Sequence, residues 1–161
     1  MSDLHIRSAA SADLDRICDI AVTAWEPVYD EFRRRAGDAT FAIMFPQANQ
    51  CKDAQIRAVF DSHPDSFIVT ECDGAVAGFA TFFVVGERLG EVGNNAVHPD
   101  FQGRGIGAAQ MEEVLKRLKQ AGCEVVKVFT GLDPSHAPAR RMYEKAGFRQ
   151  WWESVTYIRE L

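Results

Sequence analysis

The sequence predicts an α/β fold, in which strands and helices alternate along one chain. Two apolar strand-like segments, 66–72 and 75–85, are separated by Asp73-Gly74, a strong signal for a two-residue hairpin. A third strand-like segment, 90–97, leads through a short turn into a glycine-rich stretch, and a helical pattern follows it. The chain therefore combines a β-hairpin with a strand–loop–helix unit.

The first 60 residues are predicted to hold one strand and at least two helices. The strand lies at 4–8, and Ser11 is a suitable N-cap for the helix that follows. Pro27 is expected to interrupt this helix or to begin a new turn. A further helix is predicted at 53–60. The apolar residues of the first helix recur at helical spacing: Leu14, Ile17, Cys18, Ala21 and Trp25.

The last third of the chain alternates between helical and extended patterns. Gly122 is expected to end the helix that follows the glycine-rich stretch. The remaining predicted elements are a strand at 124–132, a helix at 138–146 and two short strands at 148–152 and 155–158.

Length and composition indicate one globular domain that spans residues 1–161. A hydrophobic content of 47% and a charged content of 25% are typical of soluble proteins. No apolar run approaches the roughly 20 residues needed to cross a bilayer, and the N-terminus lacks the apolar core of a signal peptide. We therefore expect no membrane association.

The cysteine pattern and the net charge narrow the range of partners. The four cysteines lack the short paired spacings of zinc sites and redox dithiols, so we expect no metal and a cytoplasmic location. The formal net charge of −5 argues against nucleic acid as a general partner. An acidic surface would favour cationic acceptors, although only as a mild steering effect.

The glycine-rich stretch 102–107 is the most informative part of the chain. A glycine-rich loop that opens a helix leaves several backbone N–H groups unpaired and pointing one way, at the positive end of the helix dipole. Glycine also lets a ligand approach without meeting a Cβ atom. Arg104 could add a charge-assisted bond to an anionic oxygen. The stretch is therefore predicted to bind phosphate.

One candidate for this loop is the dinucleotide fingerprint, which Gly103-x-Gly105-x-x-Ala108 matches loosely. That motif requires its glycines directly at a strand end, near the start of a βαβ unit, with an acidic residue about 20 positions later. Here a five-residue turn intervenes, and the motif lies two-thirds of the way along a short chain. A nicotinamide cofactor is therefore the weaker interpretation.

A different family matches better. The Gln-x-x-Gly-x-Gly form of 102–107, the preceding Pro99 and the run 139–148 (Ala-Arg-Arg-Met-Tyr-Glu-Lys-Ala-Gly-Phe) resemble the coenzyme A loop and the tyrosine-bearing helix of the GNAT superfamily of N-acetyltransferases. The similarity extends back through 67–71 and 73–80. It covers residues 66–150 well, and the first 60 residues match only in outline.

The resemblance implies a GNAT-type three-layer fold with the element order βααβββαβαββ. Its sheet would be mixed, mostly antiparallel and about seven strands wide, with helices on both faces. The fourth and fifth strands would splay apart into a V-shaped slot.

The resemblance also implies acetyl-CoA as cosubstrate. The pantothenate arm would lie in the slot and pair with the backbone of Asn95, Ala96 and Val97. The family's frequent cofactor-binding Asn, seven residues before the Tyr, is replaced here by His136, which could donate a hydrogen bond to the arm or serve as a base. The pyrophosphate would rest on the loop formed by Gln102, Gly103, Arg104, Gly105, Ile106, Gly107 and Ala108.

Tyr143 matches the tyrosine that protonates the departing thiolate in many family members. With reference pKa values near ~10 for tyrosine and ~8.5 for a thiol, this proton transfer is about 2 kcal/mol uphill in water, and less where the thiolate is desolvated. The alternative is that Tyr143 packs on its helix and only hydrogen-bonds the cofactor sulfur.

The sequence leaves the general base open. An alkylamine of pKa ~10.4 is almost entirely protonated at neutral pH, which places roughly 4.6 kcal/mol against attack. Some family members carry a Glu on the strand after the loop helix, where this chain aligns Gly131. Glu91 is the candidate on the preceding strand, acting directly or through a water held by Asn94. A solvated Glu91 at a strand end is the alternative.

The predicted activity is therefore transfer of an acetyl group from acetyl-CoA to a primary amine by direct attack. A small-molecule amine is favoured over a protein N-terminus, and a homodimer is kept open as the assembly. The alternative is a CoA-binding regulatory or structural module of the same fold without turnover. Candidates for an aromatic wall of the acceptor pocket, which could equally be core residues, are Trp25, Tyr29, Phe32, Trp151 and Trp152.

Overall fold

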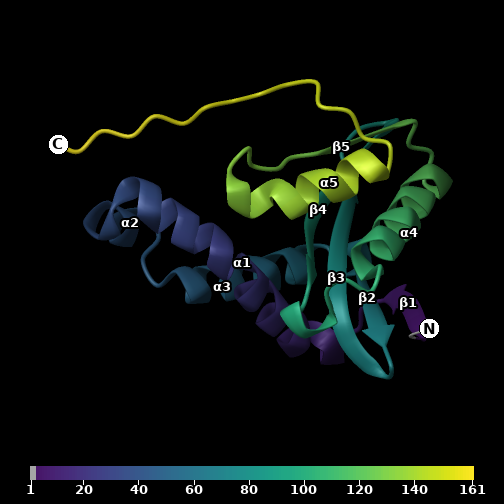
Figure 1. The fold of residues 1–161 in the computed structure, drawn as a ribbon. Coiled ribbons are helices and arrows are strands. Elements are labelled where there is room, and N and C mark those ends of the chain that lie inside the picture. Colours follow the sequence, from purple (N-terminus) through teal and green to yellow (C-terminus); the bar gives the residue numbers. More distant parts are fainter. Residues whose placement is uncertain (1–2) are drawn as a thin grey trace.

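The computed structural model describes residues 3–161, apart from the side chain of Asn49. Its centre is a five-stranded sheet in which sequential strands are neighbours, in the order β1-β2-β3-β4-β5 (Figure 1). The first three pairs are antiparallel, and β4 and β5 run parallel. The strands are β1 (Leu4–Ser8), β2 (Phe67–Cys72), β3 (Ala75–Val84), β4 (Leu89–Val97) and β5 (Val125–Val128).

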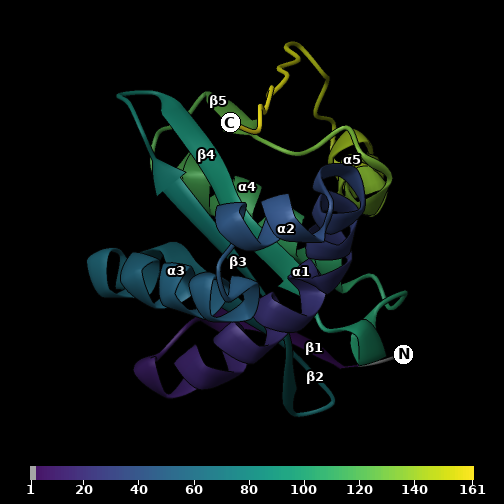
Figure 2. The ribbon, with the colours of Figure 1, turned by 90° about the vertical axis from the view of Figure 1, so that its left-hand side faces the viewer.

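Helices cover both faces of this sheet, as the family resemblance predicts (Figure 2). Helices α1 and α3 pack on one face, and α4 and α5 pack on the other. The helices are α1 (Leu14–Ala36), α2 (Asp38–Met44), α3 (Ala48–Ser62), α4 (Ile106–Gln120) and α5 (Ala137–Lys145). Four 3-10 turns precede α1, β2, α4 and α5: η1 (Ser11–Asp13), η2 (Pro64–Ser66), η3 (Pro99–Phe101) and η4 (Pro134–His136).

Strand β2 shows why the sheet has two buried faces. All but one of its six residues are buried, because its side chains alternate between two hydrophobic clusters. Phe67 and Val69 pack with α1 and α3, while Ile68 packs with α4. The Asp73-Gly74 turn joins β2 to β3 as predicted, with both residues at positive φ (53° and 82°).

Within the described residues, no helix is long and apolar enough to cross a bilayer.

A β-bulge interrupts the pairing of β3 with β4. Ala80 lies opposite Asn95 and Phe82 lies opposite Val92, so Gly93 and Asn94 together face the single residue Thr81. Because of this extra residue, the side chains after the bulge in β4 point to the opposite face of the sheet from the one that a regular strand would give them. Val92 packs against α4, whereas Ala96, four residues later, packs against α1 and α3.

The structure differs from the sequence prediction at three places. Helix α1 continues through Pro27, which costs one backbone hydrogen bond but leaves the apolar residues on both sides of it packed. The sheet has five strands and not about seven, because residues 149–161 form no strand. Strand β5 ends at Val128, earlier than predicted, and the C-terminal segment runs towards α2, where Thr40 donates a hydrogen bond to Glu160 (Figure 1).

Lys52 is the most unusual residue of the core. It lies on α3 with only 3% of its surface exposed. Its ammonium group is 2.6 Å from Asn94 Oδ1 and 3.0 Å from Gln55 Oε1, and lies 3.4 Å from the centre of the Trp25 ring. Burial lowers the pKa of Lys52 to about 7, although these three contacts favour the charged form.

This burial predicts a pH-dependent stability. An unfolded lysine, with a pKa near 10.5, binds its proton more tightly than folded Lys52 does. The free energy of unfolding should therefore rise from about pH 7 upwards, because the cost of burying the charge is complete below pH 7 and is relieved above it. We expect Lys52→Met to remove this slope. Measured by denaturant titration, the difference in free energy of unfolding between wild type and variant should change by about 1–2 kcal/mol between about pH 7 and 9.

Lys119→Met, at an exposed lysine of α4, is the matched control and should run parallel to the wild type. Parallel curves for Lys52→Met as well would show that Asn94, Gln55 and Trp25 offset the burial completely and that the pKa is not lowered.

Candidate active site

The site begins where β4 separates from β5. The parallel pairing covers only four residue pairs and ends at Val92 opposite Val128. Strand β4 continues to Val97, paired on its other side with β3. The backbone of residues 93–97 therefore has one edge to which β5 adds no hydrogen bonds. This is the splay between the fourth and fifth strands that the resemblance implies, and it includes the predicted residues Asn95, Ala96 and Val97.

The glycine loop follows the end of this open edge. Gly103 and Gly105 have φ values of +77° and +80°, which favour glycine, and a Cβ built on either would meet no atom within 4 Å. Gly105 is the N-cap of α4 and has no side-chain cap, and its carbonyl accepts the bond from Ala109 N–H. The amides of Ile106, Gly107 and Ala108 thus precede the first helical bond and point out of the helix end.

Other residues of the loop hold it in place. The Gln102 side chain donates to the Val97 carbonyl at 3.2 Å, which ties the loop to the end of β4. The Arg104 guanidinium lies 3.5 Å from Asp73 Oδ2 and over the Phe101 ring, so it also anchors the loop to the β2–β3 turn. A Cβ on Gly107 would lie 3.0 Å from Met142 Sδ, so this glycine allows α4 and α5 to pack closely.

Tyr143 connects α5 to the open strand. The residue is 7% exposed, and its hydroxyl oxygen accepts a hydrogen bond from Asn95 Nδ2 at 2.7 Å. Burial raises the pKa of the Tyr143 phenol above its ordinary value, and the Asn95 bond offsets only part of that effect. The phenol is therefore protonated at neutral pH. Since its oxygen accepts from Asn95, its own hydrogen is available for another acceptor.

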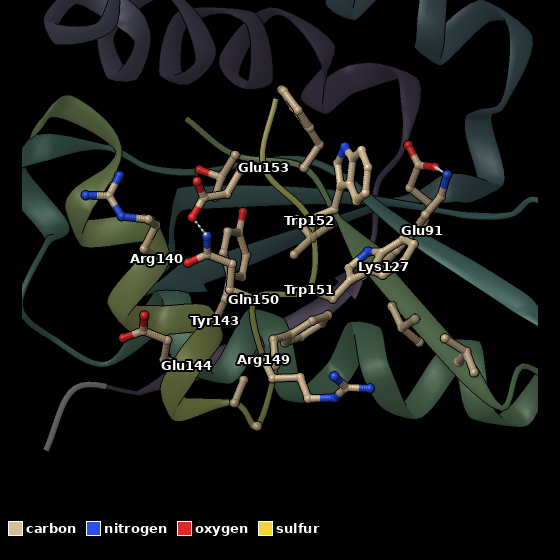
Figure 3. A pocket seen from close by; sticks show the side chains of 18 of the residues that line it. Glu91, Lys127, Arg140, Tyr143, Glu144, Arg149, Gln150, Trp151, Trp152 and Glu153 are labelled. Atoms are coloured by element: carbon tan, nitrogen blue, oxygen red, sulfur yellow. Dashed lines mark hydrogen bonds and ion pairs between the residues drawn. The ribbon is translucent and has the colours of Figure 1, made fainter. Parts of the chain in front are cut away.

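Glu91 lies too far from the Tyr143–Asn95 hydrogen bond to be a direct partner of Tyr143. It is opposite Lys127 in the β4–β5 pair, and Lys127 Nζ is 2.8 Å from Glu91 Oε2. Four residues of strand separate Glu91 from Asn95, about 13 Å in extended chain. Both Glu91 and Tyr143 border a hollow of about 830 Å³ between β5, α5 and the C-terminal segment, with Trp151 and Trp152 beside it (Figure 3).

His136 is held by a carboxylate at the start of α5. Its Nδ1 is 2.6 Å from Asp133 Oδ2, and Asp133 also accepts from the Ser135 backbone N–H and hydroxyl. Burial acts to raise the pKa of Asp133, but the bonds from Ser135 and His136 outweigh it and hold the pKa below its ordinary value. Throughout residues 3–161, no three His, Cys, Asp or Glu side chains gather as a metal site would require.

Sequence reasoning missed several of these relations. Asn95 was expected to contribute only through its backbone, so the role of its side chain was missed. Lys52 and Asp133 were not singled out. Asp133 carried a local signal, because an Asp just before Pro134 is a frequent cap, and it does cap η4. Trp25, a candidate either for the aromatic wall or for the core, lies under the Lys52 ammonium. Tyr29 and Phe32 pack against Phe45 between α1 and α2.

Comparison with known sequences agrees with this geometry. The model of the acetyltransferase (GNAT) family matches residues 17–148. A mycothiol acetyltransferase of Stackebrandtia nassauensis is 30% identical over 160 residues, which are 94% of this chain and 52% of that protein. Another, of Acidothermus cellulolyticus, is 34% identical over 111 residues, covering 60% of this chain and 33% of that protein. The chain thus spans between a third and about half of the length of these relatives.

Solved structures share the fold at low identity. The protein PH1933 of Pyrococcus horikoshii superimposes with a TM-score of 0.74 at 18% identity, over 95% of this chain and 93% of that one. The PaiA N-acetyltransferase of Thermoplasma acidophilum, solved with coenzyme A, gives 0.71 at 17% identity, over 91% and 90% of the two chains. Since the family model matches most of its length, the chain belongs to the GNAT family of acetyltransferases.

Proposed function

We propose that the protein transfers an acetyl group from acetyl-CoA to the primary amine of a small molecule by direct attack of the amine on the thioester. The observation that carries this proposal is the meeting of three features: the open edge of β4, the glycine loop at its end, and the Tyr143 hydroxyl bonded to Asn95. Together they offer a place for an extended arm, an anion and a leaving group.

The cosubstrate is expected to bind through main-chain groups. The arm would pair with the open backbone at Asn95, Ala96 and Val97, and the pyrophosphate with the amides of 102–108. The room beside Gly103 and Gly105 and the uncapped end of α4 support this fit. The contacts predicted for the Arg104 and His136 side chains stay predictions, and the bonds of both to neighbouring carboxylates give them structural roles as well.

Tyr143 is proposed as the general acid. The Asn95 amide fixes the phenol oxygen, which leaves the phenol hydrogen free to pass to the sulfur as the carbon–sulfur bond breaks. The raised pKa of Tyr143 makes it a weaker acid than in water, but the burial that raises it would also raise the pKa of a thiol at the same place.

The acceptor class rests on relatives and on charge. The names of the sequence relatives and of one structural neighbour, an aminoglycoside N-acetyltransferase (TM-score 0.66, 16% identity, 100% and 97% coverage), refer to small-molecule acetyl acceptors. The net charge of −5 supports a cationic amine. A cytoplasmic location, which the four free thiols support, a single domain and the homodimer remain predictions.

Acetyl-CoA binding is the first test. In a calorimetric titration, we expect the wild type to bind acetyl-CoA with a Kd of about micromolar order and to show no binding of NADH. Gly105→Val should abolish binding. The φ of +80° strains any L-residue by about 1–2 kcal/mol, and the new side chain would project beside the open amides.

Gly122→Val is the matched control, because Gly122 has a φ of +90° at the opposite end of α4. It should carry a similar strain and retain binding. Equal loss in both variants would mean that the loop acts only through stability. Binding of acetyl-CoA without thiol release across a panel of small amines would favour the non-catalytic module instead.

Removal of the Tyr143 hydroxyl tests the acid. Tyr143→Phe keeps the ring in its buried place and should lower kcat by about 10²–10⁴-fold, with little change in acetyl-CoA affinity. Thiol release under saturating amine is the measurement. Tyr157→Phe, at a residue 90% exposed in the C-terminal segment, is the control. An unchanged kcat in Tyr143→Phe would leave Tyr143 as a packing residue.

A further inference from the structure

We propose that His136, oriented by Asp133, is the general base that removes the proton of the acceptor amine. This assignment rests on the proposed acetyl transfer and identifies the group that the sequence left open. The residues that carry it lie in the segment 131–140, whose turn η4 packs against α1 and leads into α5, the helix that carries Tyr143.

The carboxylate selects one tautomer of the imidazole. Asp133 Oδ2 can only accept, so the 2.6 Å bond places the hydrogen of neutral His136 on Nδ1. The lone pair is then on Nε2, to which no described residue forms a hydrogen bond. A general base must present such a lone pair to its substrate. It is best oriented by a third group, which also stabilises the imidazolium after proton transfer.

Asp133 is itself fixed in place. Its Oδ1 accepts from the Ser135 N–H at 3.0 Å and from the Ser135 hydroxyl. The Arg140 guanidinium, one turn into α5, donates to the carbonyls of Gly131 and Asp133 at 2.6 and 2.9 Å. Asp133 and His136 are 11% and 22% exposed at their side chains, so the pair is largely shielded from bulk water while its edge remains accessible.

Gly131 leaves the space that the pair occupies. A Cβ at this position would lie 2.6 Å from His136 Nδ1 and closer still to Asp133 Oδ2. Any side chain at 131 would therefore displace the carboxylate or the imidazole. The φ of Gly131 is not in the left-handed region, so close approach and not backbone strain explains glycine here.

The position of His136 suits a base that works with Tyr143. His136 is the N-cap of α5, and Tyr143 follows seven residues later, about two helical turns and about 10 Å further along the axis. A thioester with its sulfur at Tyr143 could receive an amine from the side of His136, directly or through one water. Glu91, by contrast, is paired with the Lys127 ammonium.

The proton balance is complete with these two groups. The amine nitrogen forms the bond to the carbonyl carbon, and its proton passes to His136 Nε2. The carbon–sulfur bond breaks, and the sulfur takes the phenol proton of Tyr143. The products are the amide and the free thiol of coenzyme A. The imidazolium then returns a proton to the tyrosinate, directly or through solvent.

Chemical rescue tests the assignment. His136→Ala should lower kcat/KM for an alkylamine acceptor by about 10²–10⁴-fold, and added imidazole should restore a saturable part of the rate. Its acetyl-CoA affinity, measured by calorimetry, should stay at the wild-type value. His63→Ala is the control, because His63 is an exposed residue at the end of α3 whose ring packs edge-on against Phe83.

A second measurement needs no substrate. Long-range proton–nitrogen NMR spectra of the wild type at alkaline pH should show neutral His136 with its hydrogen on Nδ1. Asp133→Asn should shift the ring away from this single tautomer. A wild-type His136 with its hydrogen on Nε2 would overturn the proposal, whatever happens to the folding of the variants.

The outcomes separate this inference from the proposed function. Wild-type activity in His136→Ala would overturn the base assignment and leave the acetyltransferase standing. Parallel loss of acetyl-CoA affinity and of activity, without rescue, would make His136 a cofactor contact and overturn the inference. If the wild type binds acetyl-CoA but releases no thiol with any amine, the proposed function fails, and the assignment fails with it.

Discussion

The rest of the site depends on the bulge in β4. Because Gly93 and Asn94 together face Thr81, the alternation of side chains along β4 shifts by one residue at the bulge, and the residues after it face the side opposite to the one a regular strand would give them. Asn94 reaches Lys52 on α3, and Asn95 reaches Tyr143 on α5. The Thr81 hydroxyl donates to the Asn94 carbonyl and fixes the bulge at its extra residue. The pairing with β5 stops at Val92, immediately before this point, so the irregularity and the splay coincide.

The absence of side chains is as necessary to this arrangement as their presence. A Cβ on Gly93 would collide with Thr81 and would lie 2.8 Å from the Phe83 ring, so the bulge needs glycine there for reasons of space. Gly107 and Gly131 likewise admit Met142 and the Asp133–His136 pair. Gly103 and Gly105 differ from these three, because nothing crowds them and their positive φ is what favours glycine. The site is thus shaped by main chain on the cosubstrate side and by side chains on the side of α5.

The parts of the fold that local signals determine were predictable from the sequence. The Asp73-Gly74 hairpin and the loop before α4 follow from turn chemistry and helix-end geometry, which act within a few residues. The closing strands predicted at 148–152 and 155–158 were wrong, because a strand forms only by pairing with another segment, and a local apolar pattern does not encode that pairing. The burial of Lys52 and the bulge in β4 could not be predicted for a similar reason. Burial of a lysine and a one-residue shift in register both arise from distant segments and leave no periodic trace.

Helix α5 therefore has a larger part in the chemistry than its nine residues suggest. Its first turn follows the Asp133–His136 pair, its middle carries Arg140 back to the carbonyls of the preceding segment, and its last turns place Tyr143 against Asn95. One rigid element thus sets the separation between a candidate base and a candidate acid, while the bulge of β4 sets where the acid meets the open strand. A rigid frame of this kind lowers the cost of orienting two reactants, which is the main contribution that α5 would make to the proposed direct attack.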